Sequence, residues 1–195
     1  MGGGICQVST TLYNAVLRAE LNVTERSPHS MTVHYVDLSE DAAIAGTYKD
    51  FKFVNSTEYP IYIEGYTTSD KKITFNIYGK ETRDKNRTIS FESQMVSETP
   101  ATTILQEDAG QGIGYKAVSS KGSSGYVAEL YKIVKVNGVE TDRIKVNKST
   151  YKGTNRVVTY GTAGDPTLSE NLRAAIAAQD EALADANIAA AVPAQ

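Results

Sequence analysis

A single cysteine, Cys6, stands near the start of this 195-residue chain and is the side chain best suited to covalent chemistry. Three glycines precede it at 2–4, and apolar residues recur at helical spacing from Ile5 onward, so we expect a helix to begin beside the thiol. Unpaired N–H groups and the dipole at a helix start favour a thiolate, the nucleophilic form of cysteine. Gly3 and Gly4 would leave backbone N–H groups free to hold a developing oxyanion. The alternative is a small buried thiol behind a tight glycine turn.

The expected helix, residues 5–20, has two faces. An apolar stripe expected to face the core consists of Ile5, Val8, Leu12 and Val16. A second face, at about 100° per residue, carries Cys6, Thr10, Tyr13 and Leu17. Cys6 should therefore lie in the first helical turn, beside the apolar stripe and not within it.

Composition limits the classes of function. The formal net charge is −3 and there is no basic run, so nucleic acid is not an expected partner. One cysteine excludes an internal disulfide, and one cysteine with two histidines is too few for a structural zinc site, so no metal or cofactor is expected. No apolar stretch is long enough to span a membrane, and no signal peptide is recognisable. The chain opens on its glycines without an element to position them, so we expect it to be a fragment.

Residues 1–80 are expected to form an α+β unit, with the helix packed on an antiparallel sheet. A turn is expected at Ser27-Pro28, because proline has no N–H and restricts the residue before it. Alternating or β-rich runs predict the strands, with a hairpin turn between the last two. The predicted strands are 31–36, 51–54, 61–67 and 73–78.

Residues 81–165 read as an elongated all-β module in which glycines separate the strands. A long strand is expected over 126–136 and its partner over 143–147. Asn137-Gly138 between them is a strong hairpin signal, because both residues accept positive φ. We also expect a flexible joint at 81–87, which would make the α+β unit and the β module separate bodies.

Residues 166–195 form an Ala-rich tail, for which we expect a C-terminal helix capped by Asp165 or Thr167. Alanine favours helix but buries little surface, so such a helix is marginal or depends on a partner. A low-complexity tail is the alternative.

Two stretches of the sequence resemble known families. Residues 2–79 resemble the C-terminal half of the VanW family domain, through the run from Gly2 to Asn14 and a set of later matches. Those later matches are Arg26, Pro28-His29-Ser30, Tyr35-Val36, Asp41-Ala42, Asp50 to Phe53 and Ile61 to Ile63. The β module resembles the G-five (G5) module of bacterial surface proteins, through Gly125, Asn137-Gly138, Arg143 and the segment from Val158 to Gly161.

The VanW resemblance implies a cell-wall protein of a Gram-positive bacterium, outside the membrane, in a family named from vancomycin-resistance clusters. Such domains look like cysteine L,D-transpeptidases, which would crosslink peptidoglycan stem peptides. The G5 resemblance implies binding to wall glycan that contains N-acetylglucosamine, or a rigid spacer. Three classes therefore stay open: a transpeptidase, a noncatalytic wall-binding protein linked to glycopeptide resistance, and a structural spacer.

The VanW resemblance also suggests roles for particular residues. Cys6 would be the nucleophile and His29, in the Pro-His-Ser match, the base, with His34 as the second choice. Asp41 or Asp37 would orient the imidazole. Further residues expected to line the site are Ser9, Tyr13, Ser30 and Arg26, the last as a ligand for a substrate carboxylate.

Capping, packing or plain solvation would explain each of those further residues equally well. In the β module the candidate glycan contacts are Tyr115, Tyr126 and Tyr131, because aromatic faces pack on sugar rings. Packing across strands is the alternative for these tyrosines.

Overall fold

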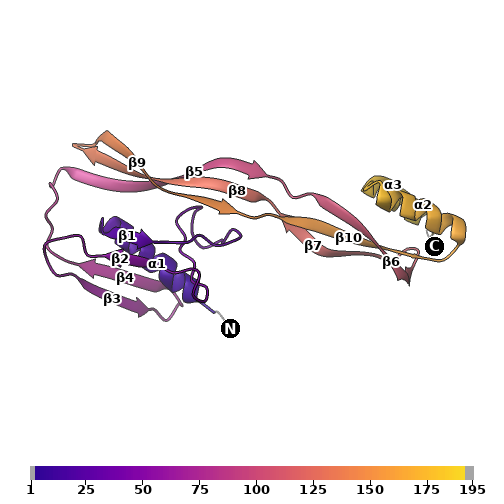
Figure 1. Cartoon of the computed structure of the whole chain (residues 1–195), viewed down its shortest axis with the longest axis horizontal. Coiled ribbons are helices and arrows are strands. Elements are labelled where there is room, and N and C mark those ends of the chain that lie inside the picture. The colour runs from indigo at the N-terminus through magenta and orange to yellow at the C-terminus, as the bar shows by residue number, and fades with distance from the viewer. Residues whose placement is uncertain (1–2, 192–195) are drawn as a thin grey trace. The chain divides into compact units, whose positions relative to one another are not determined.

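The structure is a computed structural model that describes residues 3–191; residues 1–2, which include Gly2 of the glycine run, and residues 192–195 lie outside the described residues. Contacts between Cα atoms divide the chain into two compact units (Figure 1). Unit 1 comprises residues 1–98 and 126–152, and unit 2 comprises residues 99–125 and 153–195. Each unit therefore contains part of the predicted β module.

In unit 1 the first helix, α1 (Ile5–Arg18), packs against strand β4 of a two-stranded antiparallel sheet. That sheet pairs β3 (Tyr62–Thr67) with β4 (Ile73–Tyr78). A second pair joins β1 (Asn22–Glu25) to β2 (Lys52–Val54). The predicted helix and the hairpin are confirmed, whereas β1 was not predicted.

The buried face of α1 differs from the predicted apolar stripe. Ile5 and Val8 are 54% and 43% exposed, whereas Thr10, Tyr13 and Leu17 are buried. The face that carries Cys6 is therefore the inward one, and the prediction for the N-terminal half of the stripe is wrong. The positions of the apolar residues did not identify the buried face of α1. Polar side chains can be buried on that face because their polar atoms are hydrogen-bonded.

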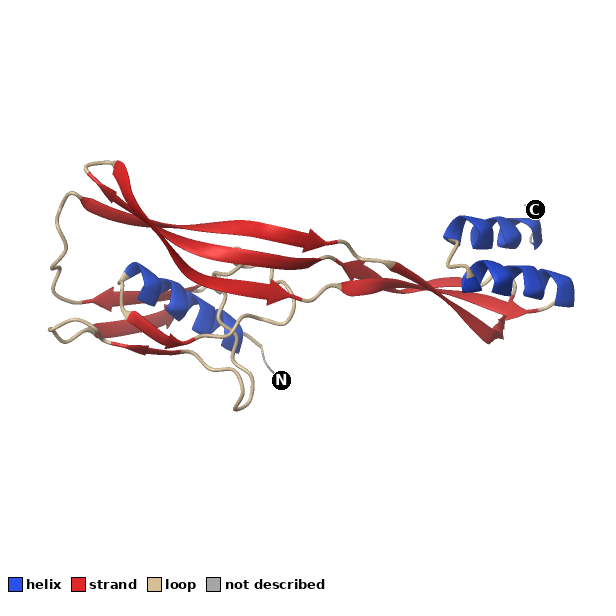
Figure 2. Cartoon of the chain, turned by 45° about the horizontal axis from the view of Figure 1, so that its top comes forward, coloured by secondary structure: helices blue, strands red, loops and turns tan. Residues whose placement is uncertain are grey.

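The segment from residue 26 to residue 51 is a long loop, apart from one isolated bridge between Ala45 and Lys49 (Figure 2). The strand predicted over 31–36 is wrong. Its alternation has no partner strand, and Ser39 adopts a positive φ of 67° where the loop turns back toward α1. This loop supplies much of the polar site described below.

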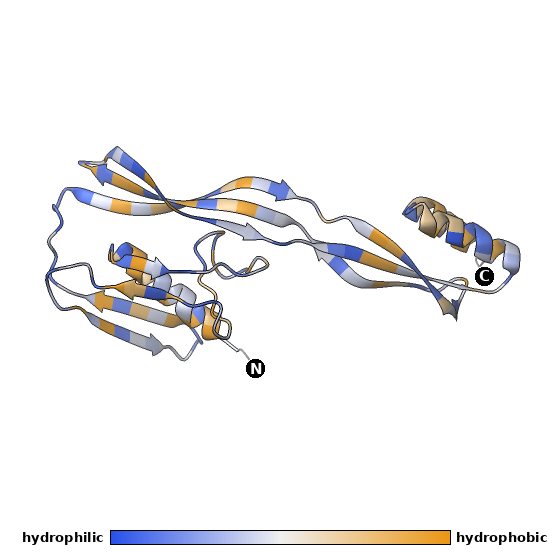
Figure 3. Cartoon of the chain, viewed as in Figure 1, coloured by the Kyte–Doolittle hydropathy of each residue, from blue (hydrophilic) through white to orange (hydrophobic). Residues whose placement is uncertain are grey.

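The other sheet of unit 1 has the order β5-β8-β9. Its strands are β5 (Arg87–Thr99), β8 (Gly125–Val136) and β9 (Val139–Tyr151), and hydrophilic and hydrophobic bands alternate along them (Figure 3). Asn137 and Gly138 form the turn with φ of 53° and 81°, as predicted. The sheet packs on the first 80 residues, because Leu130 of β8 shares one core cluster with Tyr13, Leu17 and Ala42.

Charged groups reinforce this packing at the end of α1. Glu20 binds Arg87 of β5 through two bonds of 2.5 and 2.7 Å, and Lys132 of β8 at 3.1 Å. The hydrogen-bonded Arg87 guanidinium, together with Lys132, overcomes the opposing effect of burial and lowers the pKa of Glu20 to about 2. These ion pairs hold Glu20 at a φ of 57°, a left-handed conformation that glycine usually takes after a helix.

Unit 2 contains a three-stranded sheet and a helical hairpin. The sheet has the order β6-β10-β7, with β10 (Thr154–Ala163) parallel to β6 (Thr103–Gly112) and antiparallel to β7 (Lys116–Ser123). An added Cβ at Gly153 would lie 2.6 Å from two backbone atoms, so glycine is required there.

The Ala-rich tail forms two helices, α2 (Pro166–Ala177) and α3 (Glu181–Ala191), instead of the single helix predicted. Asp165 caps α2 by accepting hydrogen bonds from Thr167 and Leu168, as predicted. Both helices are short, and they are stabilised by packing on β6 and β10. The shared cluster consists of Leu105, Val158, Tyr160, Leu172, Ala175, Ile176 and Ala184.

The fold class is as predicted: an N-terminal helix on an antiparallel sheet, then an all-β region, then C-terminal helices. The boundaries between the two units nevertheless do not fall at 81–87, where a joint was predicted. Phe91 and Val146 pack on the same cluster as Tyr13, so this core continues across the predicted joint. The boundaries at 80 and 165 stay predictions from sequence.

Leu130 offers a direct test of this shared core. Its side chain is fully buried, so Leu130→Ala should lower the free energy of unfolding of unit 1 by about 2–5 kcal/mol, through lost burial and the cavity left behind. Denaturant unfolding measures the change. Val139→Ala, 67% exposed on the same hairpin, is the control and should cost under about 0.5 kcal/mol. Equal effects of the two variants would contradict a shared core.

Candidate functional site

Cys6 lies in the first turn of α1, as predicted. Gly4 is the residue before the helix and has a φ of 90°, which favours glycine. It has no side chain to bond the first N–H groups of the helix. The Cys6 side chain is half-buried, and its Sγ lies 3.6 Å from the carbonyl oxygen of Ile44.

The loop segment from residue 39 to residue 44 runs along this first part of α1. The hydroxyls of Ser9 and Thr10 donate to the carbonyl of Ala42 at 2.6 and 3.3 Å. Thr10 in turn accepts a hydrogen bond from the Ala42 N–H at 3.0 Å. These bonds fix the segment against the helix, and they explain why the inward face of α1 carries hydroxyl groups.

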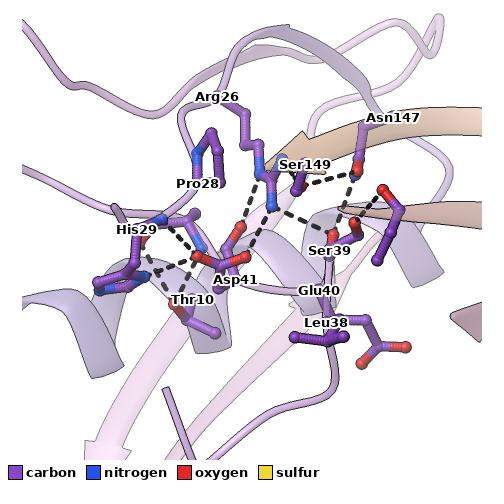
Figure 4. A network of polar contacts seen from close by, with 12 residues as sticks. Thr10, Arg26, Pro28, His29, Leu38, Ser39, Glu40, Asp41, Asn147 and Ser149 are labelled. Carbon is purple, nitrogen blue, oxygen red and sulfur yellow. Dashed lines mark hydrogen bonds and ion pairs between the residues drawn. The ribbon is translucent and has the colours of Figure 1, made fainter. Parts of the chain in front are cut away.

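Asp41 is held in this segment with 0% of its surface exposed. Its carboxylate accepts four hydrogen bonds, two at each oxygen, several of which are drawn in Figure 4. Oδ1 accepts from Arg26 Nη2 at 2.8 Å and from the Tyr151 hydroxyl at 2.5 Å. Oδ2 accepts from the backbone N–H of His29 at 2.6 Å and contacts its ring Nδ1 at 2.7 Å.

The donors around Asp41 decide its charge. Burial acts to raise the pKa of the carboxyl group, but the bonds from Tyr151 and His29 and the positive charge of Arg26 outweigh it. The pKa of Asp41 is therefore below its ordinary value. Asp41 is a carboxylate at neutral pH and can only accept hydrogen bonds.

His29 is oriented by this carboxylate. Because Asp41 can only accept, Nδ1 must carry a proton, which leaves Nε2 of the neutral ring as the acceptor. Nε2 lies 3.5 Å from the hydroxyl of Tyr35, and the two rings meet edge to face. The His29 side chain is 18% exposed, so the imidazole is held on one side and open on the other.

Tyr35 extends this network beyond the histidine. Partial burial is the main cause that raises the pKa of Tyr35, a hydrogen bond with Thr10 acts to lower it, and the negative charge of Asp41 raises it further. The structure thus brings Asp41, His29 and Tyr35 together, and the sequence analysis did not place Tyr35 in the site. Cys6 contacts the same loop at the carbonyl of Ile44.

Strand β9 contributes the remaining polar residues. Asn147, Ser149 and Tyr151 lie two positions apart, so their side chains share one face of the strand. Asn147 donates to the Ser39 carbonyl at 3.0 Å, and Ser149 accepts from Arg26 at 2.8 Å. Sequence reasoning missed these residues. The available signal was a polar stripe of period two in a strand whose partner β8 is apolar.

Comparison with known families matches both parts of the chain. Residues 1–78 match the model described as "VanW like protein", and residues 91–163 match that of the G5 domain. This chain contains a VanW-like region and a G5 domain. Together they indicate a cell-wall associated protein. The VanW match lies at the N-terminal end of this chain; which part of the family's domain it represents stays a prediction.

A relative with 48% identity over 63 residues is the uncharacterized protein YoaR of Bacillus subtilis (strain 168). The alignment covers 32% of this chain and 21% of YoaR. Among solved structures, an IgA1 protease G5 domain is 24% identical, with a TM-score of 0.31 over 43% of this chain and all of that one. The G5 domain of HP0197 is 20% identical, with a TM-score of 0.25 over 38% of this chain and 97% of that one.

Several predicted site residues of the VanW-like region have structural partners instead. Arg26 is 6% exposed in its side chain, and its donors are taken by Asp41, Ser39 and Ser149, so it is not free to bind a substrate carboxylate. Tyr13 is a core residue whose hydroxyl accepts from Asn147 at 2.8 Å.

The alternatives for the base and the orienting group lie apart from Asp41. His34 and Asp37 are both exposed, and the network around Asp41 contains neither. Ser30 is exposed and accepts a 3.3 Å bond from Lys49. Gly3, a predicted oxyanion residue, lies in open space, because a Cβ added there would have no heavy atom within 4 Å.

The candidate glycan contacts of the G5 domain are divided between the units. Tyr115 belongs to unit 2 and is 40% exposed. Tyr126 and Tyr131 belong to unit 1, where their hydroxyls donate to Glu98 at 3.2 Å and to Glu129 at 2.6 Å. All three rings are at least partly accessible.

Two cavities lie elsewhere in unit 1. One of about 670 Å³ is bounded by the C-terminal half of α1, the loop at 56–61 and residues 79–83. The other, about 260 Å³, lies beside Arg26 and β9. Neither is lined by Cys6 or His29.

Among residues 3–191 no cluster of acidic, histidine and cysteine side chains is suited to a metal ion. The described helices include none long and apolar enough to cross a membrane.

The lowered pKa of Asp41 predicts how stability depends on pH. The ionised carboxylate stabilises the fold fully above the ordinary carboxyl pKa, and this contribution is lost as the pH falls through the lower folded value. Asp41→Asn should therefore cost about 3–5 kcal/mol at neutral pH, because Arg26 is left buried without its counter-charge, and should weaken the loss of stability in acid. Thermal melting between neutral and acidic pH measures both effects. Asp37→Asn, at an exposed position, is the control; a wild-type-like Asp41→Asn profile would refute the argument.

Proposed function

We propose that this chain is a peptidoglycan-modifying protein of the cell wall, in which Cys6 acts as the nucleophile of an L,D-transpeptidase. The proposed compartment is the envelope of a Gram-positive bacterium, outside the membrane. The observation that supports this proposal is the buried Asp41 carboxylate, which orients His29 in the same loop whose Ile44 carbonyl the Cys6 thiol contacts. A buried carboxylate, an imidazole and a thiol in this arrangement resemble the parts of a nucleophile–base–orienter set.

In the proposed reaction the Cys6 thiolate attacks the carbonyl carbon of a stem-peptide amide. The C–N bond breaks, and the leaving amine takes a proton from the imidazolium of His29. A thioester then joins the stem peptide to Cys6. The amine of a second stem attacks this thioester, gives its proton to His29 and releases the Cys6 thiolate. The crosslink conserves the number of amide bonds, so no external energy source is required.

Features of the VanW-like region suit each step. The helix start at Gly4 and Ile5 leaves N–H groups for the oxyanion of the tetrahedral intermediate. Asp41 keeps the proton of His29 on Nδ1 and stabilises the imidazolium when it forms. Cys6 is half-buried and lines neither cavity, which suits a substrate that is part of a polymer.

Cys6→Ser tests the nucleophile. It should abolish crosslink formation and leave the fold intact, because the serine hydroxyl is nearly isosteric with the thiol but is a much weaker nucleophile. His29→Ala should reduce the rate by about 10²–10⁴-fold through loss of the general base. Purified peptidoglycan stem peptides and dimers, analysed by mass spectrometry, measure the yield.

His34→Ala is the matched control, since it removes the chain's other histidine at an exposed position and should leave the yield unchanged. Equal crosslink yields from wild type and Cys6→Ser would end the enzyme hypothesis.

A second candidate function is noncatalytic binding to wall glycan that contains N-acetylglucosamine. The observation that favours it is that the Tyr115 ring of the G5 domain is 40% exposed and the rings of Tyr126 and Tyr131 are partly accessible. Aromatic rings pack on the apolar faces of sugar rings, while the carboxylates beside Tyr126 and Tyr131 can accept bonds from sugar hydroxyls. This function is compatible with the first and would hold the chain near its substrate.

Tyr115→Ala tests the glycan hypothesis. Loss of one stacking ring should weaken co-sedimentation with peptidoglycan by about 5-fold, given roughly 1 kcal/mol for an aromatic contact. The measurement uses the Cys6→Ser background, so that covalent capture does not contribute. Tyr48→Ala in the VanW-like region, where the ring is 77% exposed, is the control and should bind as the parent does. Unchanged sedimentation with Tyr115→Ala, Tyr126→Ala and Tyr131→Ala would leave only a spacer role for these strands.

A further inference from the structure

The G5 domain makes one contact with the candidate site that no role assigned so far explains. Tyr151, the last residue of β9, is 2% exposed, and its hydroxyl donates to Asp41 Oδ1 at 2.5 Å. The same hydroxyl accepts the backbone N–H of Ser39 at 2.7 Å. Its direction is thus set by the loop, and its proton is committed to the carboxylate.

We propose that Tyr151 is a positioning residue for the site: it holds the Asp41 carboxylate so that Oδ2 stays aligned with Nδ1 of His29. The β5-β8-β9 sheet, the first sheet of the G5 domain, would then be a structural part of the VanW-like site. The inference rests on the proposed function only for the use of His29 as a base. The alignment itself can be measured without any catalysis.

The geometry explains why one hydroxyl has this effect. Arg26 and Tyr151 hold Oδ1, which leaves Oδ2 to face both the N–H and the ring of His29. Without Tyr151 the carboxylate keeps Arg26 as its only side-chain donor at Oδ1 and can rotate about its Cβ–Cγ bond. Rotation would weaken the bond to Nδ1 and allow the imidazole proton to move to Nε2, which removes the base.

The groups that face this pair come from three parts of unit 1. The loop supplies Arg26 to Asp41, Tyr35 to His29, and Lys49, whose Nζ donates to the carbonyl of Pro28. α1 supplies Thr10, which bonds Ala42 beside Asp41, and β9 supplies Tyr151. For Tyr151, which bonds Asp41 directly, the change to phenylalanine removes a single oxygen while the ring, and hence its packing, is kept.

The test uses the whole chain with ¹⁵N-labelled histidine. There are two histidines, so His34 is an internal reference in every spectrum. At a pH where both rings are neutral, wild-type His29 should show the Nδ1–H tautomer alone. Tyr151→Phe should shift His29 toward a mixture of tautomers and leave His34 unchanged. Tyr78→Phe, which removes a hydroxyl from β4 that bonds Glu64, is the matched control and should change neither.

The rate of Cys6 alkylation by iodoacetamide at neutral pH is the second readout, since Cys6 is the chain's one thiol. Tyr151→Phe should slow it by about 10-fold, the effect of losing one charge-assisted hydrogen bond, and Tyr78→Phe should not. Unchanged tautomer and unchanged alkylation in a folded Tyr151→Phe protein would overturn the proposal. If crosslinking fails but the tautomer responds, the proposed function falls while the positioning role stands.

Tyr151→Phe could prevent folding, so a second variant keeps the hydroxyl. Incorporation of 3-fluorotyrosine at position 151 makes the phenol more acidic and a stronger donor to Asp41. The ¹⁵N resonances of His29 should then shift, whereas 3-fluorotyrosine at position 78 should leave them in place. No shift with the analogue at position 151 would overturn the proposal.

Discussion

The buried charge of Asp41 is the constraint on which the organisation of unit 1 depends. A carboxylate without exposed surface is stable only if its oxygens are fully hydrogen-bonded and its charge is balanced. The donors come from two separate stretches of sequence: Arg26 and His29 from the loop, and Tyr151 from β9. Satisfying one side chain therefore fixes the loop, the imidazole and the edge of the G5 sheet at the same time.

The same constraint explains why the VanW-like region and the first G5 sheet share a core. Leu130 and Tyr13 bury apolar surface together, Glu20 binds strands β5 and β8, and Asn147 bonds the Tyr13 hydroxyl. Removing the sheet would expose this apolar cluster and leave polar atoms of the Asp41 network without partners. The G5 strands in unit 1 thus have a structural role, whether or not their tyrosines also bind glycan. In unit 2 the helical hairpin covers its own sheet in a similar way.

Much of the candidate site was predictable, and the errors have specific causes. The thiol does lie at a helix start, and of the two acidic residues left open as partners of the imidazole, Asp41 and not Asp37 bonds His29. Arg26 was predicted to bind a substrate carboxylate, and it does bind a carboxylate, but the one of Asp41. The strand predicted over 31–36 failed because alternation marks a strand only when a partner strand is available to pair with it.

The sequence by itself determined the local features: the helix that begins at Ile5, the Asn137-Gly138 turn and the cap at Asp165. These depend on backbone preferences and on bonds between neighbouring residues, so a short stretch of sequence is enough to specify them. Only the tertiary structure decided which face of α1 is buried and which residues surround Asp41. Tyr151 lies 110 residues from Asp41 along the chain, and nothing in either neighbourhood indicates the other. The free-energy cost of burying the Asp41 charge is offset by hydrogen-bond donors that are distant in sequence. Those donors come together only when the whole unit folds.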